Sequence, residues 1–199
     1  DYQLLEVLFL KYDNANVLNL LLKEDNKFIE LGIYSQDFLE EQVKEPDERI
    51  HPYLRNFIEF FKSGDREDQE KTWDNLLEEY YFDFLLSIPN DFLREWFSLQ
   101  LNLNNITTAL NCRNYDIPME SQLIGHNELV QSILRSNARD FGLTQDFPVI
   151  EQILAAWDQE NMLEREKALD TIRWNWIDDH TFFHYFTVER VIGYLLQFE

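Results

Sequence analysis

Apolar residues recur at intervals of three and four along most of this chain, which is the spacing of one face of an α-helix. The clearest stripe lies within residues 91–113 and consists of Phe92, Trp96, Leu99, Leu103, Ile106 and Leu110. Further helices are predicted over 2–23, from about residue 35, and over 52–61, 70–87 (after an acidic lead-in at 65–70), 127–139, 148–158, 161–178 and 187–196. No segment shows the sustained apolar–polar alternation of a strand. The sequence therefore predicts an all-α protein, a compact helical body of about eight or nine helices.

A short pattern of polar and apolar residues occurs twice, each time inside a predicted long helix. The first copy contains Asp13, Asn16, Val17 and Leu21, and the second contains Asn102, Asn105, Ile106 and Leu110, at a constant offset of 89 residues. A match at this long period indicates a duplicated helical unit rather than a catalytic site. We expect a single all-helical domain over 1–199, with repeat units near 2–88 and 89–199. Because the chain starts without Met and ends inside a predicted helix, we also expect a fragment of a longer chain.

The asparagines of this pattern need an explanation, because an asparagine amide competes for backbone hydrogen bonds in a helix interior. Residues three apart share a helix face, so Asp13 and Asn16 form one polar pair, and Asn102 and Asn105 form another. Such side chains either bond a neighbouring loop or helix and fix its register, or lie on a surface that a partner covers. We favour the first interpretation and leave the second open. Arg113, near the end of the second helix, is in the same way either an interface residue or a solvated side chain.

The charge of the chain narrows the kinds of partner that it suits. It carries 38 acidic and 17 basic residues, a formal net charge of −21 at pH 7. A field of this sign repels phosphate backbones and anionic lipid, so we expect no nucleic acid and no membrane surface as a partner. It attracts a basic protein surface in a salt-dependent way, although plain solubility explains the same charge. No apolar run approaches the length of a membrane span, and the single Cys112 suits a reducing cytosol.

The residue types that carry catalysis or bind metals occur here without the spacing that their chemistry needs. The five glycines form no phosphate-binding loop. Glu48 and His51 have the spacing of a di-iron ligand pair, but the second pair that such a site requires is missing. His180 and His184 are able to share a helix face, but the glutamate that follows the first histidine in zinc proteases is missing here. We therefore favour a loop or the start of a helix beside an aromatic run at this place. We therefore expect no enzyme activity, no cofactor and no metal.

Three stretches of the sequence carry a family resemblance. Tyr12, Asp13, Asn16 and Val17, followed by leucines, resemble the repeated YDxxN helix of the C-type subunits of V-type ATPases, whose eukaryotic form is the d-type subunit. Asn102, Asn105, Ile106, Leu110 and Arg113 resemble the second occurrence of that helix, with Asn102 in place of the usual acidic residue. More closely, the chain resembles an uncharacterised bacterial family encoded in V-type ATPase operons. Arg173, Trp174 and the segment 186–196 are similar to the C-terminal signature of that family.

This resemblance implies a mechanical function. It implies a funnel-like, all-helical body like that of the C-type and d-type subunits, without catalytic groups, which transmits rotation between ATP chemistry and the movement of protons or sodium ions. The implied partners are the axle subunits of the V-type ATPase and its membrane rotor ring, at a cytoplasmic location peripheral to the membrane. An acidic surface would steer a basic end of the axle. Two other classes stay open: a general acidic helical scaffold or adaptor for a basic protein partner, and a helical enzyme with an acidic pocket.

Overall fold

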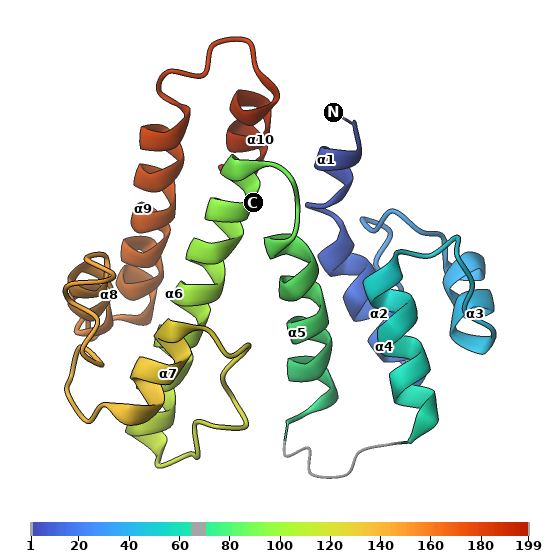
Figure 1. Ribbon diagram of the computed structural model, residues 1–199, viewed down its shortest axis with the longest axis horizontal. Coiled ribbons are helices and arrows are strands. Elements are labelled where there is room, and N and C mark those ends of the chain that lie inside the picture. The colour runs from blue at the N-terminus through green and yellow to red at the C-terminus, as the bar shows by residue number, and fades with distance from the viewer. Residues whose placement is uncertain (1, 65–70, 199) are drawn as a thin grey trace. The chain divides into compact units, whose positions relative to one another are not determined.

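The computed structural model describes residues 2–64 and 71–198, and these residues form ten α-helices and no strand (Figure 1). The helices are α1 (Tyr2–Glu6), α2 (Leu10–Leu22), α3 (Gln36–Lys44), α4 (Pro52–Ser63), α5 (Trp73–Leu86), α6 (Asp91–Tyr115), α7 (Glu128–Arg135), α8 (Ile150–Trp157), α9 (Met162–Thr181) and α10 (Val188–Leu196). The prediction of an all-α fold is confirmed. None of these helices is long and apolar enough to cross a membrane. The acidic lead-in predicted at 65–70 lies outside the described residues.

The tenth helix arises because the first predicted helix is interrupted. Where α1 gives way to α2, the N–H groups of Leu8, Phe9 and Tyr12 bond the carbonyl groups three residues earlier, at 3.1, 2.9 and 3.0 Å. Bonds of this kind wind the chain more tightly than an α-helix does. The apolar stripe of 2–23 continues through the tight turn, so its spacing alone does not reveal the break.

Side-chain caps explain where several helices begin. In five helices, the side chain of the capping residue accepts a hydrogen bond from a backbone N–H in the first turn. These caps are Ser35, Thr72, Asn90, Asn127 and Asn161. These N–H groups have no partner within the helix, so a capping oxygen stabilises its start by about 1 kcal/mol. The helices α2 and α6 also end alike, because Lys23 (φ 58°) and Asp116 (φ 53°) both adopt the left-handed conformation.

The chain divides into two compact units, Asp1–Ser87 and Ile88–Glu199, next to the boundary between the predicted repeat units. In the first unit, α2 packs against α3, α4 and α5, and α4 packs against α5. In the second unit, α6 packs against α7 and α8, α8 packs against α9, and α9 packs against α10. Each unit thus contains a long helix of the repeated pattern, then a short capped helix and a packed pair of helices. The description of 1–199 as a single domain stays a prediction.

Each unit has its own buried core. In the first unit, Phe57 of α4 is fully buried, and its ring meets those of Trp73 and Tyr80 edge-on at centroid distances of 6.2 and 5.7 Å. In the second unit, α10 approaches α9 closely at Gly193, where a Cβ atom would lie 2.9 Å from the methyl group of Thr181. The absence of a side chain at this position therefore allows α10 to pack directly on α9.

Candidate functional site

The first copy of the repeated pattern holds the loop that follows α2 against the helix. Asn16 is only 2% exposed, and its side chain donates to the Ile29 carbonyl and accepts from the Ile29 N–H, both at 2.9 Å. One amide side chain therefore pairs both backbone groups of one loop residue, as a neighbouring strand does in a sheet. We call this pair of bonds the Asn16 clamp.

The second copy makes the same contact in the second unit. Asn105 of α6 is 1% exposed, donates to the Ile124 carbonyl at 2.9 Å and accepts from the Ile124 N–H at 2.8 Å. We call this pair the Asn105 clamp. The loop residue lies 13 positions after the asparagine in the first clamp and 19 in the second, so one device holds loops of different length. Both asparagines thus bond a neighbouring loop, as the favoured interpretation of the sequence predicts.

Asp13 makes a further contact with the loop of the first unit. Its buried carboxylate accepts hydrogen bonds from the N–H groups of Ile33 at 2.9 Å and Tyr34 at 3.2 Å. Gly32 approaches the same carboxylate so closely that a Cβ atom there would overlap one of its oxygens. Burial raises the pKa of Asp13 from 3.8 to about 6, although the two N–H groups act in the opposite direction. At the corresponding place in the second unit, the Oδ1 atom of Asn102 is buried and receives no hydrogen bond from the described residues.

Arg113 holds a further loop, between α7 and α8. Its Nη1 and Nη2 atoms donate to the carbonyl groups of Ala138 and Ser136, both at 2.6 Å, and its guanidinium lies 3.9 Å from the ring centroid of Phe141. Phe141 is fully buried and has a φ of 54°, which is uncommon for an aromatic residue. Charge-assisted bonds and a cation–π contact therefore stabilise a strained turn. Burial lowers the pKa of the Arg113 guanidinium.

The burial of these residues bears on the interface role that the sequence leaves open. Asp13, Asn16 and Asn105 are at most 2% exposed, and backbone groups of their own unit already bond them. Asn102 and Arg113 are partly exposed. The structure assigns four of the five residues to holding loops against helices. A contact of any of the five with a partner protein stays a prediction.

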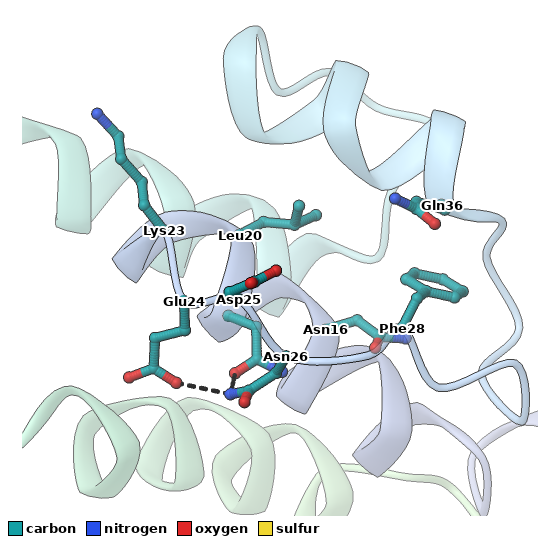
Figure 2. Close-up of a pocket in the computed structure, with 9 residues that line it drawn as sticks. Asn16, Leu20, Lys23, Glu24, Asp25, Asn26, Phe28 and Gln36 are labelled. Carbon is teal, nitrogen blue, oxygen red and sulfur yellow. Dashed lines mark hydrogen bonds between the residues drawn. The ribbon is translucent and has the colours of Figure 1, made fainter.

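Pockets flank the repeated pattern in both units. The pocket beside the Asn16 clamp has a volume of about 310 Å³ and is lined by α2, the loop after it and the start of α3 (Figure 2). On its wall, the Asn26 amide donates to the side chains of Asn19 at 2.9 Å and Glu24 at 2.8 Å. In the second unit, a pocket of about 320 Å³ lies beside Asn102 and the start of α7. The repeated helix therefore borders a small hollow in each unit.

A third pocket contains a group of residues that sequence spacing does not bring together. His180 and His184, at the end of α9 and just after it, line this pocket with the carboxylates of Asp91, Glu95 and Glu189. The Nε2 atom of His180 lies 4.0 Å from Glu95, and the Nδ1 atom of His184 lies 3.8 Å from Glu189. We call this third pocket the α9–α10 pocket. Across residues 2–64 and 71–198, no three His, Cys, Asp or Glu side chains are arranged to hold a metal ion.

The helices and the repeated clamps define an all-helical protein in which two units carry the same helix-to-loop contact. Over residues 1–199, the sequence matches the family DUF2764, whose description is "protein of unknown function". The chain therefore belongs to this family. No curated protein and no solved structure matches the chain.

The raised pKa of Asp13 predicts a pH dependence of stability that Asp13→Asn removes. The folded protein holds the Asp13 proton up to about pH 6, whereas the unfolded chain releases it near 3.8. The stability contributed by this proton is therefore fully present below pH 3.8 and is lost as the pH rises through about 6. Relative to Asp13→Asn, the wild type should lose free energy of unfolding over this window. Urea unfolding at several values from about pH 4 to about pH 7 measures the difference.

The matched control for this prediction is Asp25→Asn, which removes an exposed carboxylate from the loop after α2. Its unfolding curves should keep a constant offset from those of the wild type over the same pH range. If Asp13→Asn also keeps a constant offset, Asp13 does not titrate in the window that its burial predicts.

Proposed function

We propose that this protein is a non-catalytic central-stalk component of a V-type rotary ATPase, which couples the rotor axle to the membrane rotor ring during ion transport. The sequence resemblance to the C-type subunits supports this function, since it covers three stretches in the same order. The all-helical fold and its division into two units agree with the body of repeated helical units that the resemblance implies. The proposed location is cytoplasmic and peripheral to the membrane through the ATPase complex.

The observation that carries the proposal is the clamp that occurs in both units. A part that transmits torque must deform little, and loops are normally the most deformable segments of a helical protein. Here the Asn16 clamp and the Asn105 clamp pair both backbone groups of a loop residue with a buried side chain of a long helix. Buried hydrogen bonds of this kind resist local opening, because an unmade bond leaves polar groups without a partner. The motif residues of the resemblance therefore have a mechanical role that suits the proposal.

The net charge of −21 suits a basic partner within the complex. Opposite charges steer association, and salt screens the attraction over about 8 Å at physiological ionic strength. We therefore expect the protein to bind the axle subunits of the V-type ATPase with a stability that falls as salt rises. The expected rate of association also falls with salt, because steering acts before contact is made.

The experiment mixes the full chain with the purified axle subunits of the same organism and measures the products by size-exclusion chromatography with light scattering, at low and at high salt. A stoichiometric complex that weakens at high salt is the expected result. A complex that is insensitive to salt would remove electrostatic steering from the proposal. No complex with the full-length protein at either salt concentration would contradict the coupling function.

The alternative function is that of a general acidic scaffold or adaptor that binds a basic protein other than an axle. The same charge favours it, because a net charge of −21 does not depend on the identity of the partner. The two functions differ in one measurable respect. A scaffold binds several unrelated basic proteins with similar affinity, whereas a coupling component prefers its own axle over basic controls such as cytochrome c or lysozyme.

A further inference from the structure

The connection between α9 and α10 exposes four aromatic rings within five residues. These are Phe182, Phe183, Tyr185 and Phe186, which are 63%, 82%, 72% and 106% exposed. The connection extends beyond the ends of both helices (Figure 1). We call residues 182–186 the aromatic loop. Exposed apolar groups gathered in one place are typical of interaction sites, because water contact with them is unfavourable.

The backbone of this loop is strained at the most exposed ring. Phe186 has a φ of 60°, a conformation in which a bulky side chain is unfavourable. A ring that packed into the core would gain enough from burial to offset this cost, as Phe141 does in the turn between α7 and α8. Phe186 is fully exposed, so its ring gains nothing from the protein's own core. The strain therefore holds an apolar ring in water, where only another molecule is able to cover it.

The α9–α10 pocket lies at the base of the aromatic loop and is acidic. Its volume is about 490 Å³. Of its three carboxylates, Asp91 is paired with Arg94, whereas Glu95 and Glu189 face histidines at 4.0 and 3.8 Å. Hydrogen bonds, first from Thr187, lower the pKa of Glu189, which keeps its carboxylate ionised at neutral pH. A negative hollow therefore borders an apolar ridge on the same unit.

We propose that the aromatic loop and the α9–α10 pocket form one docking surface for a protein segment that carries lysine or arginine beside apolar side chains. The cationic group enters the pocket toward Glu95 and Glu189, and the apolar side chains cover the rings of 182–186. Charge selects this occupant. An anionic membrane is repelled by the acidic pocket, and a second copy of this chain would bring like carboxylates together. Only the identity of the partner rests on the proposed function. Under that function, the protein segment that docks here belongs to the axle.

The first test uses a synthetic helical peptide with lysines on one face and leucines on the other, titrated into the full chain by isothermal calorimetry. Three variants remove one element of the surface each: Glu95→Gln, Phe183→Ser and Phe186→Gly. Each should weaken binding about tenfold, since a few central residues carry most of the affinity of such a contact. Phe186→Gly should in addition keep or raise the thermal stability, because glycine adopts a φ of 60° without strain.

Matched controls separate this surface from the charge and aromatic content of the whole chain. Glu59→Gln removes an exposed carboxylate of α4, and Tyr115→Ser removes an exposed ring at the end of α6. Both should bind the peptide as the wild type does. A second peptide with the same lysines, in which serine replaces leucine, should bind about tenfold more weakly than the first.

Several results would overturn the inference. Wild-type affinity in both Glu95→Gln and Phe183→Ser would show that the peptide binds elsewhere, and equal binding of the two peptides would show that only diffuse charge acts. If the wild type floats with vesicles of phosphatidylcholine and phosphatidylserine and Phe183→Ser does not, the aromatic loop binds lipid instead of a protein segment. If light scattering shows that the wild type is a dimer and Phe183→Ser is a monomer, the aromatic loop binds a second copy of this chain.

The second test keeps the inference and the proposed function distinguishable. The same variants and controls are mixed with the axle subunits and separated by size-exclusion chromatography at low and at high salt. If the wild type binds the peptide at this surface but not the axle, the coupling function fails and the docking chemistry stands. If the wild type and all three variants bind the axle equally, the coupling function stands and the assigned surface is wrong.

Discussion

Asn105→Ala should lower the free energy of unfolding by about 2 to 6 kcal/mol, which is a large part of the stability of an ordinary domain. The substitution leaves both backbone groups of Ile124 buried without the partners that hold them at 2.9 and 2.8 Å. Each buried group that loses its bond costs about 1 to 3 kcal/mol. Urea unfolding followed by circular dichroism measures the loss, and hydrogen exchange at the Ile124 amide localises it.

The neighbouring residue provides the control for this prediction. Asn104→Ala makes the same chemical change at an exposed position of α6, so its effect should stay within about 0.5 kcal/mol. Asn105→Asp is the second variant, because its carboxylate would face the Ile124 carbonyl oxygen without a hydrogen to donate. It should destabilise the protein at neutral pH at least as much as Asn105→Ala does. Equal stability of Asn104→Ala and Asn105→Ala would contradict the role of the Asn105 clamp.

Gly32→Ala should lower the free energy of unfolding by about 2 to 4 kcal/mol, because the added methyl group collides with the buried carboxylate of Asp13. The new Cβ atom would overlap one carboxylate oxygen and lie 2.8 Å from Cγ. The carboxylate must then move away from the N–H groups of Ile33 and Tyr34, so a steric penalty adds to the loss of two hydrogen bonds. Gly32 lies outside the left-handed region, so its backbone accepts alanine and the cost is that of the contact alone.

A double-mutant cycle tests this assignment. In the Asp13→Ala background, the carboxylate that collides with the new methyl group is gone, so Gly32→Ala should cost less than about 1 kcal/mol. The cycle then gives a coupling energy of at least about 1 kcal/mol between positions 13 and 32. Faster hydrogen exchange at the Ile33 and Tyr34 amides in Gly32→Ala would report the same displacement. Equal costs of Gly32→Ala in both backgrounds would show that the penalty arises from another neighbour.

The apolar spacing predicted the helices well, for a physical reason. In α6, every residue of the stripe from Phe92 to Leu110 is buried, because packing rewards apolar residues at intervals of three and four. The break between α1 and α2 was missed, since a tight turn at Leu8 and Phe9 changes the hydrogen bonds without interrupting the stripe. The spacing of apolar residues indicates which residues of a helix are buried, but it does not show which backbone hydrogen bonds close each turn.

The site was predictable only on its helical side. The sequence identified Asn16 and Asn105 as polar residues that need a partner in a helix interior, but it did not identify Ile29 and Ile124. The contact is made to N–H and carbonyl groups that nearly every residue carries, so no residue type marks it. The close approach of Gly32 to Asp13 left no signal for the same reason, because any loop glycine looks alike in the sequence.

The aromatic run after α9 was recognised, but its exposure was not. Large apolar side chains are most often buried, so a run such as 182–186 favours a role in the core unless the fold shows otherwise. The α9–α10 pocket was likewise hidden, because Glu95 and His180 are far apart in the sequence and come within 4.0 Å only in the folded unit. Surfaces made of distant segments have no local pattern to read.

Because both clamps bind only the main chain, they restrict the amino-acid sequence of the two loops very little. The N–H and carbonyl groups that Asn16 and Asn105 bind are present in every residue type except proline, which lacks the N–H. A side-chain change at position 29 or 124, or a change in loop length, leaves the bonds available. The clamps thus require asparagine in each helix, whereas the loops are able to vary in sequence and in length. The two units are in this way able to differ in their loops without losing the helix-to-loop contact that they share.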